Sequence, residues 1–238
     1  AGGAPGTTEV GLAGALAAME DAYEVLKAAL LAAGAAGRWR MPALETSLRR
    51  FSALRSAAQQ AAKAARLFAR QGFASASPSS LAEACGISKS LIYHYYPSKE
   101  AILFDVMNEH MDELLAAIDE AKDGGGAPGD IIKRFTRALM RRYTGAADRQ
   151  KVLLYELNAL PERERREIIE KQRQLIAFVE ELLSGASRAD DDEHALGART
   201  MLYFGMLNWT HTWFKPAGPV SRDDVADMAA DLVLANFL

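Results

Sequence analysis

A helix-turn-helix pattern between residues 67 and 100 constrains this chain more than any other feature. Small and apolar residues over 81–85 suit a short buried helix, and Gly86 can take the left-handed conformation that ends it. Ser88 is suited to cap the next helix, because its side-chain oxygen can accept a hydrogen bond from an otherwise unpaired amide. That next helix, predicted over 89–95, is short and polar on one side. This order of elements indicates a motif whose second helix enters the major groove of DNA.

These residues resemble the tetracycline-repressor (TetR) family of bacterial regulators. The matching elements are Leu67-Phe68, Gly72-Phe73, Leu81-Ala82, Gly86-Ile87-Ser88-Lys89, Tyr93-His94-Tyr95-Tyr96 and Ser98-Lys99-Glu100-Ala101. The preceding helix departs from the family, because Gln60 and Ala61 stand where an Ile-Leu pair is usual. The resemblance implies a homodimer with an all-α fold of about nine helices. An N-terminal three-helix DNA-binding module would precede a helical ligand-binding and dimerisation domain, and this chain would add one N-terminal helix.

The predicted recognition helix supplies most of the candidate contacts with double-stranded operator DNA. Lys89, Ser90 and Leu91 lie on its first turn, where Lys89 could donate to guanine and Leu91 could touch a thymine methyl group. The resemblance implies phosphate contacts for Tyr93 and His94. Helix starts attract anions and give further candidates for phosphate contact. These further candidates are Ser77, Ser79, Ser88 and Lys99.

The distribution of charge supports a local contact with DNA. The formal net charge of the 238-residue chain is −3, which argues against a general polyanion binder. Residues 51–104 nevertheless contain six basic and two acidic residues, whereas residues 1–50 contain five of each. The acidity therefore lies in the rest of the chain. A basic module attached to an acidic body is typical of a DNA-binding protein.

Composition favours a cytoplasmic protein without membrane contact. No run approaches the ~20 apolar residues of a membrane span, and the first residues lack the basic region of a signal peptide. The single cysteine, Cys85, excludes an internal disulfide and is interpreted as a small buried residue rather than a redox sensor.

Hydrophobic spacing and turn residues predict an all-α chain in three segments, because no sustained period-2 alternation occurs. The segments are an N-terminal extension (1–46), a helix-turn-helix DNA-binding domain (47–97) and an effector-binding and dimerisation domain (98–238). Met41 could be the translation start, which would make 1–40 an upstream extension, and the alternative is a basic arm in the minor groove. The helices are predicted over 10–33, 48–71, 78–85, 89–95, 99–121, 130–143, 148–159, 161–183, 193–214 and from 221 to the end.

Aromatic and amide side chains are dense over residues 202–219, which allows two interpretations. One is a packed dimer helix, since Gly205 in mid-helix suggests close approach of another backbone. The other is an effector cavity, because buried amides and indoles need hydrogen-bond partners. The resemblance implies a dimer through helices 8 and 9, the last two, so both interpretations could hold on opposite faces. The predicted cavity residues are Tyr155, Asn158, Tyr203, Met206, Asn208 and Trp209.

Residues 154–161 and 208–219 are similar to a subgroup of TetR regulators, several of which sense acyl-CoA thioesters. The resemblance therefore implies a small-molecule effector, with an acyl- or aryl-acyl-CoA as the best candidate. Basic residues between 134 and 151 could hold the CoA phosphates, and the alternative is a solvated helix face with counter-charges. The predicted phosphate-binding residues are Arg137, Arg141 and Arg149.

Catalytic and metal motifs have little support in this sequence. It contains no Gly-x-Ser-x-Gly, phosphate loop or His-Glu-x-x-His pattern, so we expect no enzyme activity, metal or cofactor. His110, with Glu109 and Asp112, is interpreted as part of a solvated helix face. The sequence thus predicts a ligand-responsive DNA-binding transcriptional regulator, most simply a repressor. The alternative is an all-helical interaction or accessory protein, which salt-dependent, sequence-specific DNA binding would exclude.

Overall fold

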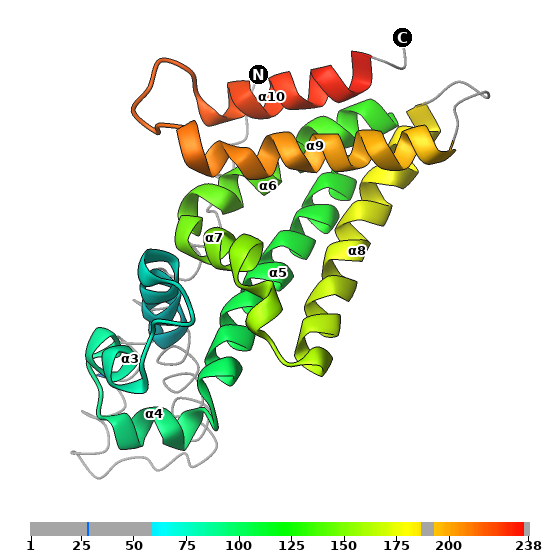
Figure 1. The fold of residues 1–238 in the computed structure, drawn as a ribbon. Coiled ribbons are helices and arrows are strands. Elements are labelled where there is room, and N and C mark those ends of the chain that lie inside the picture. The colour runs from blue at the N-terminus through cyan, green and yellow to red at the C-terminus, as the bar shows by residue number, and fades with distance from the viewer. Residues whose placement is uncertain (1–27, 29–58, 187–192, 236–238) are drawn as a thin grey trace, which may run out of the picture. The chain divides into compact units, whose positions relative to one another are not determined.

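The computed structural model describes residues 28, 59–186 and 193–235 (Figure 1). The chain divides between residues 59 and 60, and residues 60–238 form one compact unit. Within the described ranges the regular elements are all helical, which confirms the predicted all-α fold class. The predicted helix over 10–33 and the extension over 1–46 lie outside the described residues, apart from residue 28. The predicted domain boundaries stay predictions.

Three helical pieces build the N-terminal part of this unit. Residues 60–71 are helical, and α3 (Pro78–Cys85) and α4 (Lys89–Tyr95) have the predicted bounds. Phe68 and Phe73 contact each other with ring centroids 5.3 Å apart, and they pack in one core with Leu81 and Ile92. Burial of these apolar side chains holds the short helices together, because helices of this length are marginal on their own.

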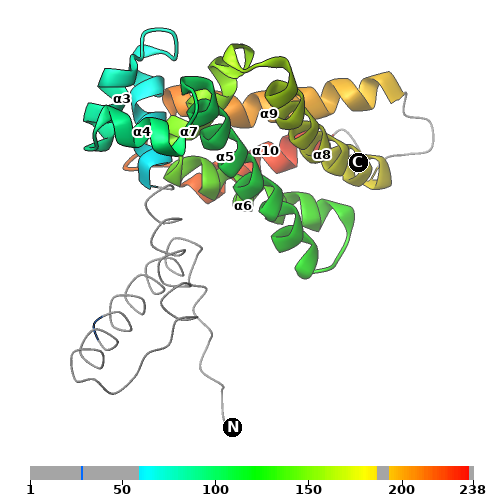
Figure 2. The same ribbon diagram turned by 90° about the horizontal axis from the view of Figure 1, so that it is seen from below.

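The remaining helices form the body of the unit. They are α5 (Lys99–Asp123), α6 (Pro128–Gly145), α7 (Ala147–Tyr155), α8 (Glu162–Ala186), α9 (Glu193–Trp213) and α10 (Arg222–Leu234). Both views show α5 beside α8, and Figure 1 shows α9 and α10 side by side at one end of them (Figures 1 and 2). Leu103, Met107, Phe135 and Leu139 are fully buried between these helices. Among the described helices, none is long and apolar enough to cross a membrane.

One predicted helix is shorter than expected. The segment predicted as helical over 148–159 ends at Tyr155, and a single 3₁₀ turn, η1 (Leu157–Ala159), follows it. Leu160 then takes an extended conformation, with φ −73° and ψ 144°. The α conformation is disfavoured for the residue before a proline, so Pro161 accounts for the extended conformation of Leu160.

Candidate DNA-binding surface and effector cavity

A tightly capped turn joins α3 to α4. Gly86 has φ +71°, its N–H donates to the carbonyl of Glu83 (3.0 Å), and the N–H of Ile87 donates to the carbonyl of Ala82 (3.1 Å). These are the paired hydrogen bonds of a Schellman motif. The Ser88 hydroxyl then accepts from the N–H of Leu91 at 3.2 Å and caps α4. Local sequence therefore determines the angle at which α4 leaves α3.

Among the side chains of α4 that the structure describes, one is buried and the others form an exposed face. Ile92 is buried in the core, whereas Lys89, Ser90 and Tyr93 are exposed and Leu91 is 39% exposed. This exposed face carries a cation, hydroxyl groups and an aromatic ring, which suit contact with base edges and phosphates. His94 lies on α4, but its side chain is outside the described residues.

The other predicted phosphate contacts lie at helix starts, and three of them, including the α4 cap Ser88, already serve the fold. Ser77 caps α3 in a capping box with Ser80, and both Ser77 and Ser79 are exposed. The ammonium of Lys99 donates to the carbonyl of Phe73 at 2.8 Å and lies 4.1 Å from the centre of its ring. Lys99 therefore joins α5 to the DNA-binding module, and its phosphate contact stays a prediction.

The body contains a cavity of about 180 Å³ between α5, α6, α7, α8 and α9. Its inner wall includes Met111 and Leu114, which are buried on α5. Most of its lining is aliphatic or aromatic. The residues that line it are Met111, Leu114, Tyr143, Gln150, Leu153, Leu154, Gln172, Leu175, Ile176, Met201, Phe204 and Asn208.

A chain of polar side chains crosses the wall of this cavity. The carboxamide oxygen of Asn208 accepts from the hydroxyl of Tyr143 (3.0 Å) and from Nε2 of Gln150 (3.1 Å). The oxygen of Gln150 faces Nε2 of His110 at 2.7 Å, and Nδ1 of His110 lies 3.8 Å from a carboxylate oxygen of Glu113. Burial raises the pKa of Tyr143, so its hydroxyl stays protonated and can donate.

The position of His110 differs from the one expected from the sequence. Its side chain is fully buried, whereas Glu109 and Asp112 on the same helix are exposed, so the interpretation of His110 as part of a solvated face is wrong. Within the described ranges, no group of acidic, histidine or cysteine side chains is arranged to hold a metal ion.

The structure brings one of the six predicted cavity residues to the cavity. Asn208 lines it, but Tyr203 is fully buried elsewhere, with its hydroxyl 2.7 Å from that of Thr136. Tyr155 is 56% exposed, and its hydroxyl lies 3.2 Å from Nε2 of His211. The other three are exposed away from the lining. They are Asn158, Met206 and Trp209.

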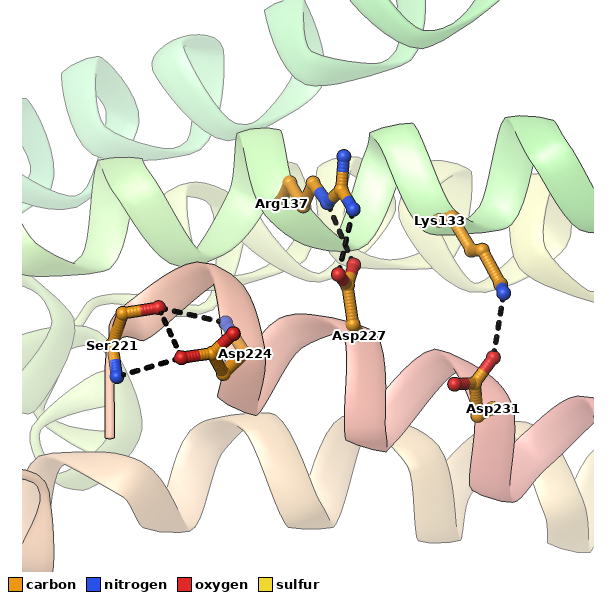
Figure 3. A network of polar contacts seen from close by, with 6 residues as sticks. All are labelled: Lys133, Arg137, Ser221, Asp224, Asp227 and Asp231. Atoms are coloured by element: carbon orange, nitrogen blue, oxygen red, sulfur yellow. Dashed lines mark hydrogen bonds and ion pairs between the residues drawn. The ribbon is translucent and has the colours of Figure 1, made fainter. Parts of the chain in front are cut away.

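The three predicted phosphate-binding arginines all have carboxylate partners. Arg137 forms two hydrogen bonds of 2.6 Å with Asp227 of α10, beside an ion pair between Lys133 and Asp231 (Figure 3). Arg141 pairs with Glu120, and Arg149 pairs with Glu113 at 2.8 Å. This arrangement matches the alternative of a helix face with counter-charges. Figure 3 also shows the capping box of α10, formed by Ser221 and Asp224.

Helix α7 has the cavity on one side and the DNA-binding module on the other. Gln150, Leu153 and Leu154 line the cavity. The ammonium of Lys151 donates to the carbonyl of Ala69 at 2.6 Å, and a carboxylate oxygen just after the helix, on Glu156, accepts from the N–H of Phe73 at 3.1 Å. Asp148 adds an ion pair of 3.7 Å with Arg66. A shift of α7 would therefore reach both sites.

Most of the cavity lining was not predicted from the sequence. Gln150 lies in a polar run, Ala147-Asp148-Arg149-Gln150-Lys151, and nothing in that run distinguishes a buried amide from an exposed one. Tyr143, near the end of a predicted helix, could have been recognised more easily as part of a polar site, because a buried tyrosine needs a partner for its hydroxyl. Gln172 lies on the amphipathic helix α8, where spacing alone assigns it to the boundary of the apolar face.

Two family models match the described unit. Residues 62–106 match the model for bacterial regulatory proteins of the tetR family, and residues 125–237 match the model for the tetracyclin repressor-like C-terminal domain. Together these matches cover the DNA-binding module and most of the body.

Two solved structures of similar proteins agree with these family matches. The chain is similar to a TetR-family transcriptional regulator from Bordetella parapertussis, at 38% identity and a TM-score of 0.71, over 76% of this chain and 97% of that one. It is also similar to AibR, solved with isovaleryl coenzyme A and operator DNA, at 25% identity and a TM-score of 0.64, over 74% and 97% of the two chains.

The curated relatives have either a lower sequence identity to this chain or a shorter matched segment. The transcriptional repressor KstR2 of Mycolicibacterium smegmatis is 24% identical over 184 residues, which is 73% of this chain and 86% of that protein. A match to a Bacillus subtilis regulator, at 37% identity, spans 24% of that regulator's length.

Proposed function

Since the chain belongs to the tetR family of bacterial regulatory proteins, we propose that it is a transcriptional repressor, rather than an enzyme, that a small molecule releases from its operator. The observation that carries this proposal is the exposed face of α4, where Lys89, Ser90 and Tyr93 project from a helix held by a capped turn. Such a helix is the reading element of the helix-turn-helix motif.

We expect Lys89→Ala and Tyr93→Ala to weaken operator binding about tenfold or more, because each removes an exposed group from the reading face. The operator would be selected from random double-stranded DNA and compared with a scrambled version by gel shift at physiological salt. Lys215→Ala, which removes an exposed cation from the turn between α9 and α10, is the matched control. Equal wild-type affinity for both DNAs would favour the all-helical accessory protein instead.

A second copy of the chain is part of the proposal, because one short recognition helix reads too few base pairs for useful specificity. Exposed large apolar side chains support the pairing of two copies through α9 and α10. On α9 they recur at coiled-coil spacing, and a Cβ added at Gly205 between them would meet no atom of this chain within 4 Å. These side chains are Leu202, Met206, Trp209 and Trp213 on α9, and Met228 and Leu232 on α10.

The release mechanism rests on α7. A ligand in the cavity touches Gln150, Leu153 and Leu154, and the same helix holds the DNA-binding module through Lys151 and, just beyond its end, Glu156. An effector releases the operator only if it prefers one of two arrangements of the module. We propose that α7, together with α5, carries that preference to the recognition helices.

Our proposal for the effector is an acyl- or aryl-acyl-CoA thioester. The complex of the similar protein AibR with isovaleryl coenzyme A supports this class. The CoA phosphates would have to replace carboxylate partners at Arg137, Arg141 or Arg149. Calorimetry with phenylacetyl-CoA and with a long-chain acyl-CoA, against free CoA, tests the class.

Arg141→Glu separates a phosphate site from a charged surface. We expect it to weaken binding of the CoA ester about tenfold if Arg141 holds a phosphate, because the charge is reversed. Arg166→Glu, at an exposed ion pair with Glu162 at the start of α8, is the control. If neither ester binds more tightly than free CoA or releases the operator, the acyl-CoA class is wrong and the repressor assignment remains.

A further inference from the structure

The chemistry of the cavity lining limits what the cavity can hold. Among the described residues that line it, none carries a formal charge. A carboxylate or phosphate buried there would lose its hydration without gaining a cation, which is costly. The part of a ligand that enters the cavity is therefore neutral.

The size of the cavity limits how many ligand atoms it can enclose. An apolar cavity of about 150 Å³ accepts benzene, so the 180 Å³ here has room for roughly seven non-hydrogen atoms on the same scale. A long-chain acyl group or a steroid nucleus carries at least about twice that number of atoms. The cavity could enclose such groups only in part, and the rest would extend to the surface, where the lining residue Met201 is 57% exposed.

Asn208 is held so that it can donate to a ligand. Its oxygen accepts from Tyr143 and Gln150, and no described residue accepts from its two amide N–H groups. Gln172 places a further carboxamide on the lining, besides those of Asn208 and Gln150. Asn208 is half-buried, so its N–H groups are not fully enclosed. A ligand that covers them must supply an acceptor, because a covered donor without a partner costs free energy.

We propose that the cavity binds a short, neutral acyl group, whose carbonyl oxygen accepts a hydrogen bond from Asn208 while its hydrocarbon part packs against the aliphatic lining. Gln172 is the second polar contact. Tyr143, Gln150 and His110 are positioning residues, because they hold the oxygen of Asn208 and so turn its N–H groups toward the ligand. The regulatory meaning of this site rests on the proposed repressor function.

The test uses the wild-type full-length chain without DNA and four probes that lack the CoA phosphates. They are the hexanoyl and dodecanoyl thioesters of N-acetylcysteamine, the S-hexyl thioether that lacks the carbonyl, and hexanoate. We expect calorimetry to show binding of the hexanoyl thioester and at least tenfold weaker binding of the other three. Binding of hexanoate, the dodecanoyl thioester or the thioether as tight as that of the hexanoyl thioester would overturn the proposal, as would no binding of any probe.

Two substitutions locate the contact. Asn208→Asp keeps an acceptor for Tyr143 and Gln150 but removes the N–H donors, so we expect it to reduce the affinity for the hexanoyl thioester at least tenfold and to leave the weak binding of the thioether unchanged. Should this variant fail to fold, Gln172→Glu, at a half-buried position of α8, replaces it with the same expectation. Unchanged hexanoyl binding in the folded variant would contradict the assignment.

A variant with a larger cavity provides an independent test of the site. Ile176 is half-buried on the lining, so Ile176→Ala enlarges the cavity, and we expect the preferred chain length to increase by about two to three carbon atoms. Ile169→Ala, at a half-buried position of α8 off the lining, should leave the preference unchanged. An unchanged preference in Ile176→Ala would contradict the site. Because these measurements need no DNA, a failure of operator binding would overturn the repressor function alone.

Discussion

At the scale of single residues, two polar side chains of α9 have different tasks. Asn208 lines the cavity, whereas the hydroxyl of Tyr203 is fully buried against Thr136, which also donates to the carbonyl of Ile132 at 2.7 Å. Burial raises the pKa of Tyr203, so this hydroxyl stays neutral and hydrogen-bonded. The structure gives Tyr203 a role in joining α6 to α9.

Tyr203→Phe should therefore lower the free energy of unfolding by about 1 kcal/mol, because it removes one buried hydrogen bond and leaves Thr136 a second partner. Urea unfolding measures the loss. Effector affinity, measured by calorimetry, should stay within about twofold of wild type. A large loss of affinity at wild-type stability would instead place Tyr203 in the binding site.

Residues that act through local backbone were predictable, and residues that act through distant partners were not. Ser88 and Ser98 could be recognised as caps from their neighbours alone, and both accept the expected amide hydrogen bonds. His110 could not be assigned, because its partner Gln150 lies 40 positions away. Cys85 is buried as predicted, and burial raises the pKa of its thiol, which disfavours the reactive thiolate.

At the scale of elements, α7 is the helix whose length the sequence overstated and whose importance it missed. The α-helix ends at Tyr155 and a 3₁₀ turn follows it. The periodicity of this segment could not show that opposite sides face the cavity and the DNA-binding module. The long helices α5 and α8 were easier to predict, because their apolar faces repeat over many turns.

Lys151→Met should uncouple effector binding from operator release. The substitution keeps an apolar stem but removes the ammonium that holds the carbonyl of Ala69. We expect the effector-induced change in operator affinity to fall at least fivefold, while each ligand alone binds almost as in wild type. Glu156→Gln, which keeps an acceptor for Phe73, is the matched comparison and should retain coupling. Full coupling in Lys151→Met would exclude this role of α7.

The contact between α6 and α10 makes the protein sensitive to acid. The hydrogen bond to Arg137 holds the pKa of Asp227 below its usual range, against a smaller opposing effect of burial. A lowered folded-state pKa means that the stabilisation is complete above the unfolded-state pKa of about 3.9 and is lost as pH falls through the folded value. Similar pairs lower the pKa values of Glu113 and Glu120, although burial alone raises them.

Asp227→Asn should flatten this acid dependence. We expect its melting temperature to fall less steeply than that of wild type below about pH 4, and its stability at pH 7 to fall by less than about 1 kcal/mol, because the pair is partly exposed. Thermal melts from pH 3 to pH 7 measure both effects. Asp119→Asn, at an exposed position of α5, serves as the control and should follow the wild-type curve.

At the scale of the whole molecule, the exposed apolar side chains of α9 and α10 are the main feature that a single copy leaves unexplained. Trp209 and Trp213 are 61% and 52% exposed, and Leu202 is 70% exposed. Contiguous apolar side chains of this size are typical of protein interfaces. The sequence showed the aromatic density of this segment but could not divide it between an inner and an outer face.

Trp209→Glu should convert a homodimer into a monomer, because it places a charge in the proposed interface. Sedimentation velocity measures the mass, and operator affinity should fall with the loss of the second recognition helix. Val220→Glu introduces the same charge at an exposed apolar position outside α9 and α10, and it should remain dimeric. A monomeric wild-type protein at micromolar concentration would contradict the proposed dimer.

Two of the three polar contacts described between the α7 region and the DNA-binding module use main-chain atoms of the module, and the third is the ion pair of Asp148 with Arg66. Lys151 contacts the carbonyl of Ala69, and Glu156 contacts the N–H of Phe73. Every residue type offers that carbonyl, and every type except proline offers that N–H. Mutations that retarget the protein to a new operator can therefore accumulate without erasing its response to the effector. The same independence would let an engineer join this sensing body to the reading helices of a relative and keep the chimera inducible.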